Sequence, residues 1–302
     1  MNILLAFKHF PVSSGRYIQR ALTRIGHNVM TCGHEIGNKI WNIVVDDKYI
    51  HRANYTEPGN IWYDSPYDEQ VVLAAFKRDA NWTPDLIITA DSTLYLSNPQ
   101  DKIPHVVWGA DNHVRFYNQR NYYKMFFAHS WGARMTEPNA VWLPAAYDPE
   151  VHVDMGWERD IDVGMMGVTY QNRVDVINAM DAEGIDIKGG MGLLWEQYNG
   201  FYNHCKIALV RSIDGDLTQR FFENMAQGCC VLADKPKDAD KAGVCAGVDY
   251  WTYDGTPEGA VREAKFLLES ECWRDIAANG KRKVIGYEWD ARATQLLKEV
   301  FG

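Results

Sequence analysis

The sequence predicts an α/β protein made of two Rossmann-like domains that face a central cleft. Strand-like apolar runs alternate with helical runs along the chain, a pattern typical of parallel strands joined by helical crossovers. The 302 residues fit two ordinary domains better than one. Residues 143–159 have mixed polarity and contain Pro144, Pro149 and Gly156, which makes them the best linker candidate. We therefore predict domains at 1–148 and 149–302.

The first half is expected to contain short buried strands over residues 2–7, 28–32, 85–89 and 104–108. Its amphipathic runs predict helices over residues 16–25 and 71–79. Residues 41–68 are polar and aromatic and give no clear assignment.

The second half repeats the alternation. Strands are predicted over residues 162–166, 185–188, 206–210 and 229–233, and helices over residues 172–183, 193–204, 218–227, 257–270, 272–284 and 289–300. Open parallel sheets bind ligands at the carboxyl ends of their strands. Two such halves place a ligand site in the cleft between them.

Composition excludes several classes of protein. Hydrophobic residues make up 46% and charged residues 24%, which rules out disorder, and the net charge of −9 disfavours a protein that mainly coats nucleic acid or anionic membrane. No segment approaches the roughly 20 apolar residues of a membrane helix, and the opening apolar run is too short for a signal peptide. None of the six cysteines forms a C-x-x-C pair. We expect a cytoplasmic protein with buried free thiols, no membrane insertion and no metal site.

The most informative segment is residues 207–234, where a buried strand opens into a polar loop and then a helix. Asp216 or Thr218 is expected to cap this helix. Its amino end offers free N–H groups that suit a diphosphate, and Glu223, one turn further in, can accept hydrogen bonds from both hydroxyls of a ribose. The alternative is that Arg220 and Glu223 form an ordinary surface ion pair at i,i+3.

The run R-F-F-E-N-M-A-Q-G at residues 220–228, followed by an apolar strand, resembles the donor-binding motif of GT-B glycosyltransferases, most of all their CgeB-like (spore-maturation) branch. The resemblance continues through D-Y-W-T-Y at 249–253, I-A-A-N-G at 276–280 and Y-E-W-D-A-R at 287–292. It covers residues 160–301 well and the first half in outline.

The resemblance implies two facing Rossmann-like domains, with the C-terminal helix packing back toward the N-terminal domain. The nucleotide sugar would bind mainly to the C-terminal domain, and the acceptor would approach from the N-terminal one. Glu223 resembles the ribose-binding glutamate of the family. An acidic residue that touches the sugar in one relative falls at Gly215 here, a departure that leaves the stereochemistry of transfer open.

Four further positions fit a donor site. Gly167 follows the first strand of the second half, and Arg173 lies at the start of the next helix, so a backbone approach and a guanidinium fork can meet a phosphate there. The alternative is a plain turn followed by an exposed arginine. Gly189 is expected in a loop that passes beside the base, and Arg211 ends its strand where it can neutralise a leaving diphosphate.

Candidate acceptor-side residues follow strands of the first half. Asp111 is the first candidate for a general base and His113 the second, since imidazole titrates near neutrality. Asp91 competes with them. The alternatives are a loop-capping carboxylate and a structural histidine. Gly15, before the first helix, fits a close backbone approach to ligand or a simple turn.

Residues 115–124 interleave basic and aromatic side chains. We interpret them first as an amphipathic helix with its aromatics packed inward, then as a carbohydrate surface, then as a contact for DNA bases.

We expect a glycosyltransferase that moves a sugar from a nucleotide-diphosphate donor to a hydroxyl of a glycan, a protein or a hydroxymethylated DNA base. Helix dipoles and basic side chains, with no metal or other cofactor, would stabilise the leaving group. The rival functions are a nucleotide-sugar epimerase or hydrolase of the same architecture and a non-catalytic nucleotide-sugar or glycan-binding protein.

Overall fold

The computed structural model describes residues 1–7, 12–33, 44–45, 48–49, 61–62, 77–78, 81–90, 103–113, 122–132, 134–168 and 170–302. The chain divides into two compact units. Unit 1 consists of the described residues within Met1–Asn42, His51–Ala145 and Trp289–Gly302, and unit 2 of those within Ile43–Ile50 and Ala146–Glu288. The proposed domains 1–148 and 149–302 stay a prediction.

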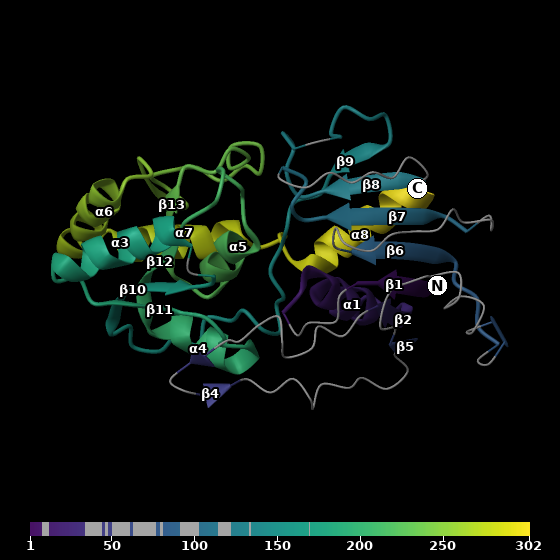
Figure 1. Cartoon of the computed structure of the whole chain (residues 1–302), viewed down its shortest axis with the longest axis horizontal. Coiled ribbons are helices and arrows are strands. Elements are labelled where there is room, and N and C mark those ends of the chain that lie inside the picture. Colours follow the sequence, from purple (N-terminus) through teal and green to yellow (C-terminus); the bar gives the residue numbers. More distant parts are fainter. Residues whose placement is uncertain are drawn as a thin grey trace. The chain divides into compact units, whose positions relative to one another are not determined.

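Unit 1 is built on a parallel sheet in the order β5-β2-β1-β6-β7-β8-β9 (Figure 1). The strands are β1 (Asn2–Ala6), β2 (Asn28–Gly33), β5 (Ile61–Trp62), β6 (Leu86–Ala90), β7 (His105–Gly109), β8 (Lys124–Phe127) and β9 (Ala140–Trp142). Both β6 and β7 are buried along their whole length, as expected for inner strands of a parallel sheet. The four strands predicted for this half are confirmed as β1, β2, β6 and β7.

Two helices of unit 1 are described over their whole length. In α1 (Ser14–Arg24) the Ser13 hydroxyl accepts the backbone N–H of Arg16 as an N-cap. In α8 (Trp289–Phe301), Asp290 accepts hydrogen bonds from Arg24 Nε at 3.0 and 3.1 Å, and the Trp289 ring meets Trp108 edge-on at 5.2 Å. The C-terminal helix therefore packs into the N-terminal unit, as the sequence predicts.

Unit 2 has a parallel sheet in the order β11-β10-β12-β13-β14. Its strands are β10 (Ile161–Met166), β11 (Ile187–Gly190), β12 (Cys205–Val210), β13 (Cys230–Asp234) and β14 (Trp251–Tyr253). Its helices are α3 (Gln171–Ala182), α4 (Trp195–His204), α5 (Gln219–Ala226), α6 (Pro257–Glu269) and α7 (Trp273–Lys283). A short antiparallel pair, β3 (Val44–Val45) with β4 (Lys48–Tyr49), also falls in this unit.

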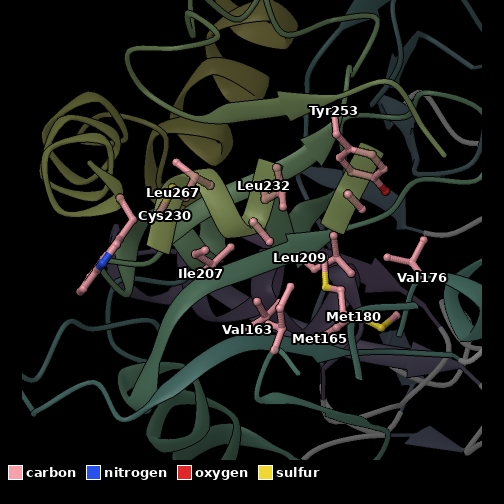
Figure 2. Packing of buried hydrophobic residues seen from close by; sticks show 14 of the residues in the cluster. Val163, Met165, Val176, Met180, Ile207, Leu209, Cys230, Leu232, Tyr253 and Leu267 are labelled. Carbon is pink, nitrogen blue, oxygen red and sulfur yellow. The ribbon is translucent and has the colours of Figure 1, made fainter. Parts of the chain in front are cut away.

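The core of unit 2 follows from the alternation of side chains along its strands. Ile207 and Leu209 of β12 point to the face covered by α3, α6 and α7, where they join Met180 and Leu267 in one apolar cluster (Figure 2). Ala208, between them, joins the cluster on the α4 face. A buried strand with both faces covered leaves its polar side chains only at its ends.

Three predictions for these elements need correction. The strand predicted over residues 185–188 is β11 at Ile187–Gly190, so Gly189 lies inside a strand and pairs with Met165. Lys124 begins strand β8, so the predicted helix over 115–124 is wrong at its end, and 114–121 lie outside the described residues. Cys245 is exposed, whereas four of the six free thiols are buried.

No helix in the described part of the chain combines the length and apolar character needed to cross a membrane.

Candidate functional site

The order in which strands are added to the sheet of unit 2 reverses at β10 and β12. The next strand, β11, lies on one side of β10, whereas β12, β13 and β14 follow one another on the other side. Ligand sites of open parallel sheets lie at the carboxyl ends of the strands at such a reversal. A ligand site is therefore expected at the segments that follow β10 and β12.

Two arginine side chains meet beside Gly167, the residue that follows β10. Gly167 has φ +146, and a Cβ added there would collide with Arg220 Nη1 and lie 3.5 Å from Arg173 Nη1. Arg220, from α5, donates to the carbonyl of Met166 at 2.6 Å. The missing Cβ thus lets two guanidinium groups approach the same turn.

Arg173 is buried, with 4% of its surface exposed, so the alternative of a solvent-exposed arginine is wrong. It donates to the carbonyl of Val168 at 2.7 Å and to that of Arg211 at 3.2 and 2.9 Å, tying the turn after β10 to the end of β12. Burial, followed by the charge of Arg220, lowers the pKa of Arg173 to about 10. Arg173 therefore stays charged at neutral pH, and a bound anion would relieve its repulsion with Arg220.

The start of α5 lies in the same region and carries no side-chain cap. Thr218 occupies the N-cap position, but its hydroxyl has no hydrogen-bond partner in the described residues. Asp216 accepts the N–H of Ile213 at 2.9 Å instead. The predicted capping is therefore wrong for both residues, and the helix start keeps N–H groups suited to an anion.

Glu223 lies one turn further along α5 in a buried polar cluster, with 4% of its surface exposed. Its Oε2 accepts the Tyr198 hydroxyl at 2.9 Å, and its Oε1 accepts the Gln219 amide at 2.6 Å. Oε1 also lies 3.3 Å from His152 Nε2. Because Asp148 N donates to His152 Nδ1 at 3.0 Å, the ring proton is on Nε2 and faces the carboxylate.

The Tyr198 hydroxyl stays protonated at this position. Burial, followed by the negative charge of Glu223, raises the pKa of Tyr198 well above its usual value. The phenol therefore donates to Glu223 throughout the physiological range, and the expectation that Glu223 belongs to an exposed i,i+3 ion pair is wrong.

Sequence reasoning missed Tyr198, Gln219 and His152. Gln219 is four residues before Glu223 on one helix, so the i,i+4 spacing could have revealed it. Tyr198 comes from α4 and His152 from the segment before β10, and no local spacing connects them to Glu223.

Arg211 does not join the two arginines by its side chain. Its Nη1 donates to the carbonyl of Gly255 at 2.7 Å and lies 3.6 Å from Asp234 Oδ2, which directs it toward β13 and β14. Gly189, inside β11, faces the Met165 carbonyl, which would lie 3.0 Å from an added Cβ. Its smallness serves the contact between strands, and the prediction that it lies in a loop is wrong.

In unit 1, Asp111 and His113 lie in the turn after β7, at the carboxyl edge of that sheet. The His113 ring contacts His129 at 4.4 Å and Trp131 at 5.2 Å, and neither of its ring nitrogens has a hydrogen-bond partner among the described residues. Asn112, between the two candidates, is fully buried and exchanges hydrogen bonds of 2.8 and 3.0 Å with the His129 backbone. These two hydrogen bonds of the Asn112 amide, which sequence reasoning missed, hold the turn in place.

Two other candidates of unit 1 turn out differently. Gly15 is the second residue of α1, and a Cβ there would collide with the Phe7 ring, so packing explains this glycine, while its approach to a ligand stays a prediction. Asp91 lies outside the described residues.

A separate groove of about 890 Å³ lies between residues 147–159 and α7 of unit 2. Its lining includes Trp157, Arg159, Trp273 and Lys281, and it reaches His152 behind Glu223. The lining of this groove does not include Gly167, Arg173 or Arg220, so the groove is separate from the site where the two arginines meet.

Comparison with known proteins found one matching family model. Residues 155–298, which contain Glu223 and both arginines, match the family model described as glycosyl transferase-like. A search of curated proteins found no match.

Solved structures resemble the chain over almost its whole length. Sucrose-phosphate synthase from Thermosynechococcus elongatus is 13% identical with a TM-score of 0.66, and the alignment covers 98% of this chain and 97% of that one. Anabaena HepE, solved with UDP-glucose, is 11% identical with a TM-score of 0.67 and coverages of 98% and 99%. The pneumococcal O-GlcNAc transferase GtfA, solved with UDP and GlcNAc, is 9% identical with a TM-score of 0.61 and coverages of 99% and 98%.

The chain therefore has the α/β fold of the GT-B glycosyltransferases, and residues 155–298 are similar to the glycosyl transferase-like family.

Proposed function

We propose that this chain transfers a sugar from a nucleoside-diphosphate sugar to an acceptor hydroxyl. The observation that carries the proposal is the arrangement around α5 of unit 2. A buried carboxylate, Glu223, lies one turn inside the helix, and Arg173 and Arg220 meet at Gly167 beside the helix start. A ribose on the carboxylate and a diphosphate at the arginines would use both features at once.

The leaving diphosphate gains negative charge as the glycosidic bond breaks. Fixed donors in a preorganised site contribute about 3–4 kcal/mol each to stabilising such charge. Arg173, Arg220 and the uncapped N–H groups of α5 supply donors of this kind. We accordingly propose transfer that needs no metal ion, and expect turnover to survive an excess of chelator.

Activation of the acceptor hydroxyl is proposed for unit 1. Asp111 is the first candidate for the general base, and His113 the second. The ring nitrogens of His113 lack hydrogen-bond partners among the described residues, which supports a role in proton transfer. The proposed acceptor is a hydroxyl of a glycan, a protein or a modified DNA base, and the proposed branch of the fold is the CgeB-like one.

The test starts with thermal unfolding in the presence of a panel of nucleotide sugars, with UDP-glucose first because Anabaena HepE was solved with it. A ligand that binds the native state raises the unfolding temperature. The control is Glu223→Gln, which keeps the shape of the side chain and removes its charge. We expect nucleotide sugars that share one nucleotide to raise the unfolding temperature of the wild type, and to raise that of the variant less.

Product analysis then separates the possible reactions. Incubation of the stabilising donor with acceptor candidates should yield a glycosylated acceptor and free nucleoside diphosphate. Conversion of the sugar while it is still attached to the nucleotide would indicate an epimerase, and release without any acceptor a hydrolase. Failure of every nucleotide sugar to stabilise the protein would contradict the proposed function.

A further inference from the structure

We propose that the Gln219 amide occupies the place of a ribose hydroxyl on Glu223, and that a nucleotide must displace it in order to bind. This inference rests on the proposed function, since it assumes that Glu223 receives a ribose. It identifies Gln219 as a specificity-determining residue that the sequence motif does not contain.

The hydrogen bonds of Glu223 leave little room for a ligand. A carboxylate accepts about four hydrogen bonds, two on each oxygen. Oε1 accepts the Gln219 amide at 2.6 Å and lies 3.3 Å from Nε2 of the buried His152. Oε2 accepts the Tyr198 hydroxyl at 2.9 Å and retains one position. With only 4% of Glu223 exposed, two neighbouring ribose hydroxyls could reach both oxygens only after one of these side chains has moved.

Tyr198 and His152 are held in place by their surroundings. The Tyr198 ring contacts the rings of Tyr202 and His152 at 4.9 and 5.9 Å. His152 is buried, with 2% of its surface exposed, and its other nitrogen accepts the N–H of Asp148. Moving either ring would disturb the packing behind the carboxylate.

Gln219 is placed differently. It is the first residue of α5, half-buried, and it reaches along the helix to Glu223 from the end where a diphosphate would bind. Its unbranched side chain can rotate to another rotamer without moving the helix. A nucleotide whose phosphates lie at the helix start therefore meets the Gln219 amide before it meets the carboxylate.

The consequence is measurable in the discrimination between ribose and deoxyribose. In the wild type, a 2′-hydroxyl gains a hydrogen bond to Glu223 while the Gln219 amide loses one, so the hydroxyl adds little affinity. Without the amide, the hydroxyl keeps its full contribution. Removal of Gln219 should therefore tighten the binding of ribonucleotides and leave 2′-deoxyribonucleotides much less affected.

The experiment measures dissociation constants by calorimetry for ADP, GDP, CDP and UDP and their 2′-deoxy counterparts, and follows the base that binds the wild type best. Gln219→Ala removes the amide, and Gln219→Met removes it while keeping the length of the side chain. We expect both to bind the ribonucleotide about five- to tenfold more tightly and to raise the deoxy-to-ribo ratio of dissociation constants by a similar factor, which is within the range for the net contribution of one hydrogen bond.

A matched control exists on α3. Gln171 is the first residue of that helix, and its amide donates to Asp175 at 2.8 Å with the same i,i+4 spacing, but this pair is exposed. Gln171→Ala should leave both constants unchanged, so a change common to the two variants would reflect the helix start and not the carboxylate.

An unchanged or weakened ribonucleotide affinity in both Gln219 variants, with wild-type discrimination against deoxyribose, would overturn the inference alone. Binding of none of the nucleotides by the wild type would overturn the proposed function and the inference with it.

Discussion

Each unit has a glycine and a buried arginine in the region that follows its first strand, but the two regions differ in chemistry. In unit 1, Gly15 and Arg16 are the second and third residues of α1; in unit 2, Gly167 directly follows β10 and Arg173 is the third residue of α3. Gly15 packs against the Phe7 ring, and the buried Arg16 lies over that ring at 5.1 Å. Gly167 instead admits the guanidinium of Arg220. One turn is filled by an aromatic ring and the other by positive charge.

The difference shows that a glycine after a strand marks a close approach without saying what approaches. In unit 1 the approaching group comes from the end of β1 itself, and the turn is part of the core. In unit 2 the approaching group is the Arg220 guanidinium, which comes from α5. Of these two regions, both in the described part of the chain, the one after β10 brings two guanidinium groups together and therefore has the character of an anion site.

The largest expected effect separates chemistry in unit 1 from binding in unit 2. Asp111→Asn should lower turnover at least about 100-fold, the lower range for loss of a general base, with the donor dissociation constant unchanged. Steady-state kinetics and calorimetry on the same preparation measure the two quantities. Full turnover would transfer the role to His113, which His113→Gln then tests.

Loss of a guanidinium should have different consequences in the two turns. Arg220→Met should weaken the binding of a nucleoside diphosphate about 100-fold, the range for a charge-assisted pair with phosphate, while the affinity for the free nucleoside stays the same. Arg16→Met should lower the unfolding temperature and leave both affinities alone. Equal losses for nucleoside and nucleoside diphosphate in Arg220→Met would mean that the arginine does not contact phosphate.

Adding one methyl group to each glycine tests the comparison directly. Gly15→Ala forces Cβ into the Phe7 ring, and overpacking of this kind costs about 1–3 kcal/mol of unfolding free energy. Gly167→Ala strains the backbone at φ +146 and meets the far end of a flexible arginine, so it should lower stability and also displace Arg220 and lower diphosphate affinity about tenfold. Denaturant unfolding measures the stability of both variants, and calorimetry measures their affinity for the nucleoside diphosphate. A stability loss without an affinity loss in Gly167→Ala would make the two turns alike.

Acid should affect unit 1 before unit 2. Burial lowers the pKa of His105 on β7 from 6.5 to about 3. Between these two pH values the unfolded chain therefore binds a proton that the folded unit does not bind. Stability is then complete above pH 6.5 and falls by about 1.4 kcal/mol for each pH unit below it. Hydrogen exchange of β7 amides should show this slope in the wild type, with β12 amides as the internal reference. His105→Gln should flatten it, and a slope unchanged in the variant would assign the acid sensitivity elsewhere.

The sequence predicted the elements that follow from local pattern. The strand at 206–210 and the helix at 218–227 are confirmed as β12 and α5 because a buried apolar run and a glycine stop, Gly228 at φ +75, are local signals. The helix start was predicted as the site, but its caps were wrong because Thr218 and Asp216 find other environments once the loop has folded.

The partners of Glu223 could not be predicted in the same way. Tyr198 is 25 residues away, and its hydroxyl reaches the carboxylate only because α4 and α5 pack near each other. Similarly, β8 was missed because the basic and aromatic residues before it resemble an amphipathic helix, and the sheet overrides that local preference. Contacts made by the fold, and not by spacing, define the detailed chemistry of the site.

The most direct test is a crystal structure of the protein with the nucleoside diphosphate that binds it best. We predict ribose hydroxyls within hydrogen-bonding distance of Glu223, the Gln219 amide turned away, and the diphosphate between the start of α5 and the guanidinium groups at Gly167. A nucleotide bound elsewhere, for instance in the groove between residues 147–159 and α7, with Gln219 still on the carboxylate, would contradict the account.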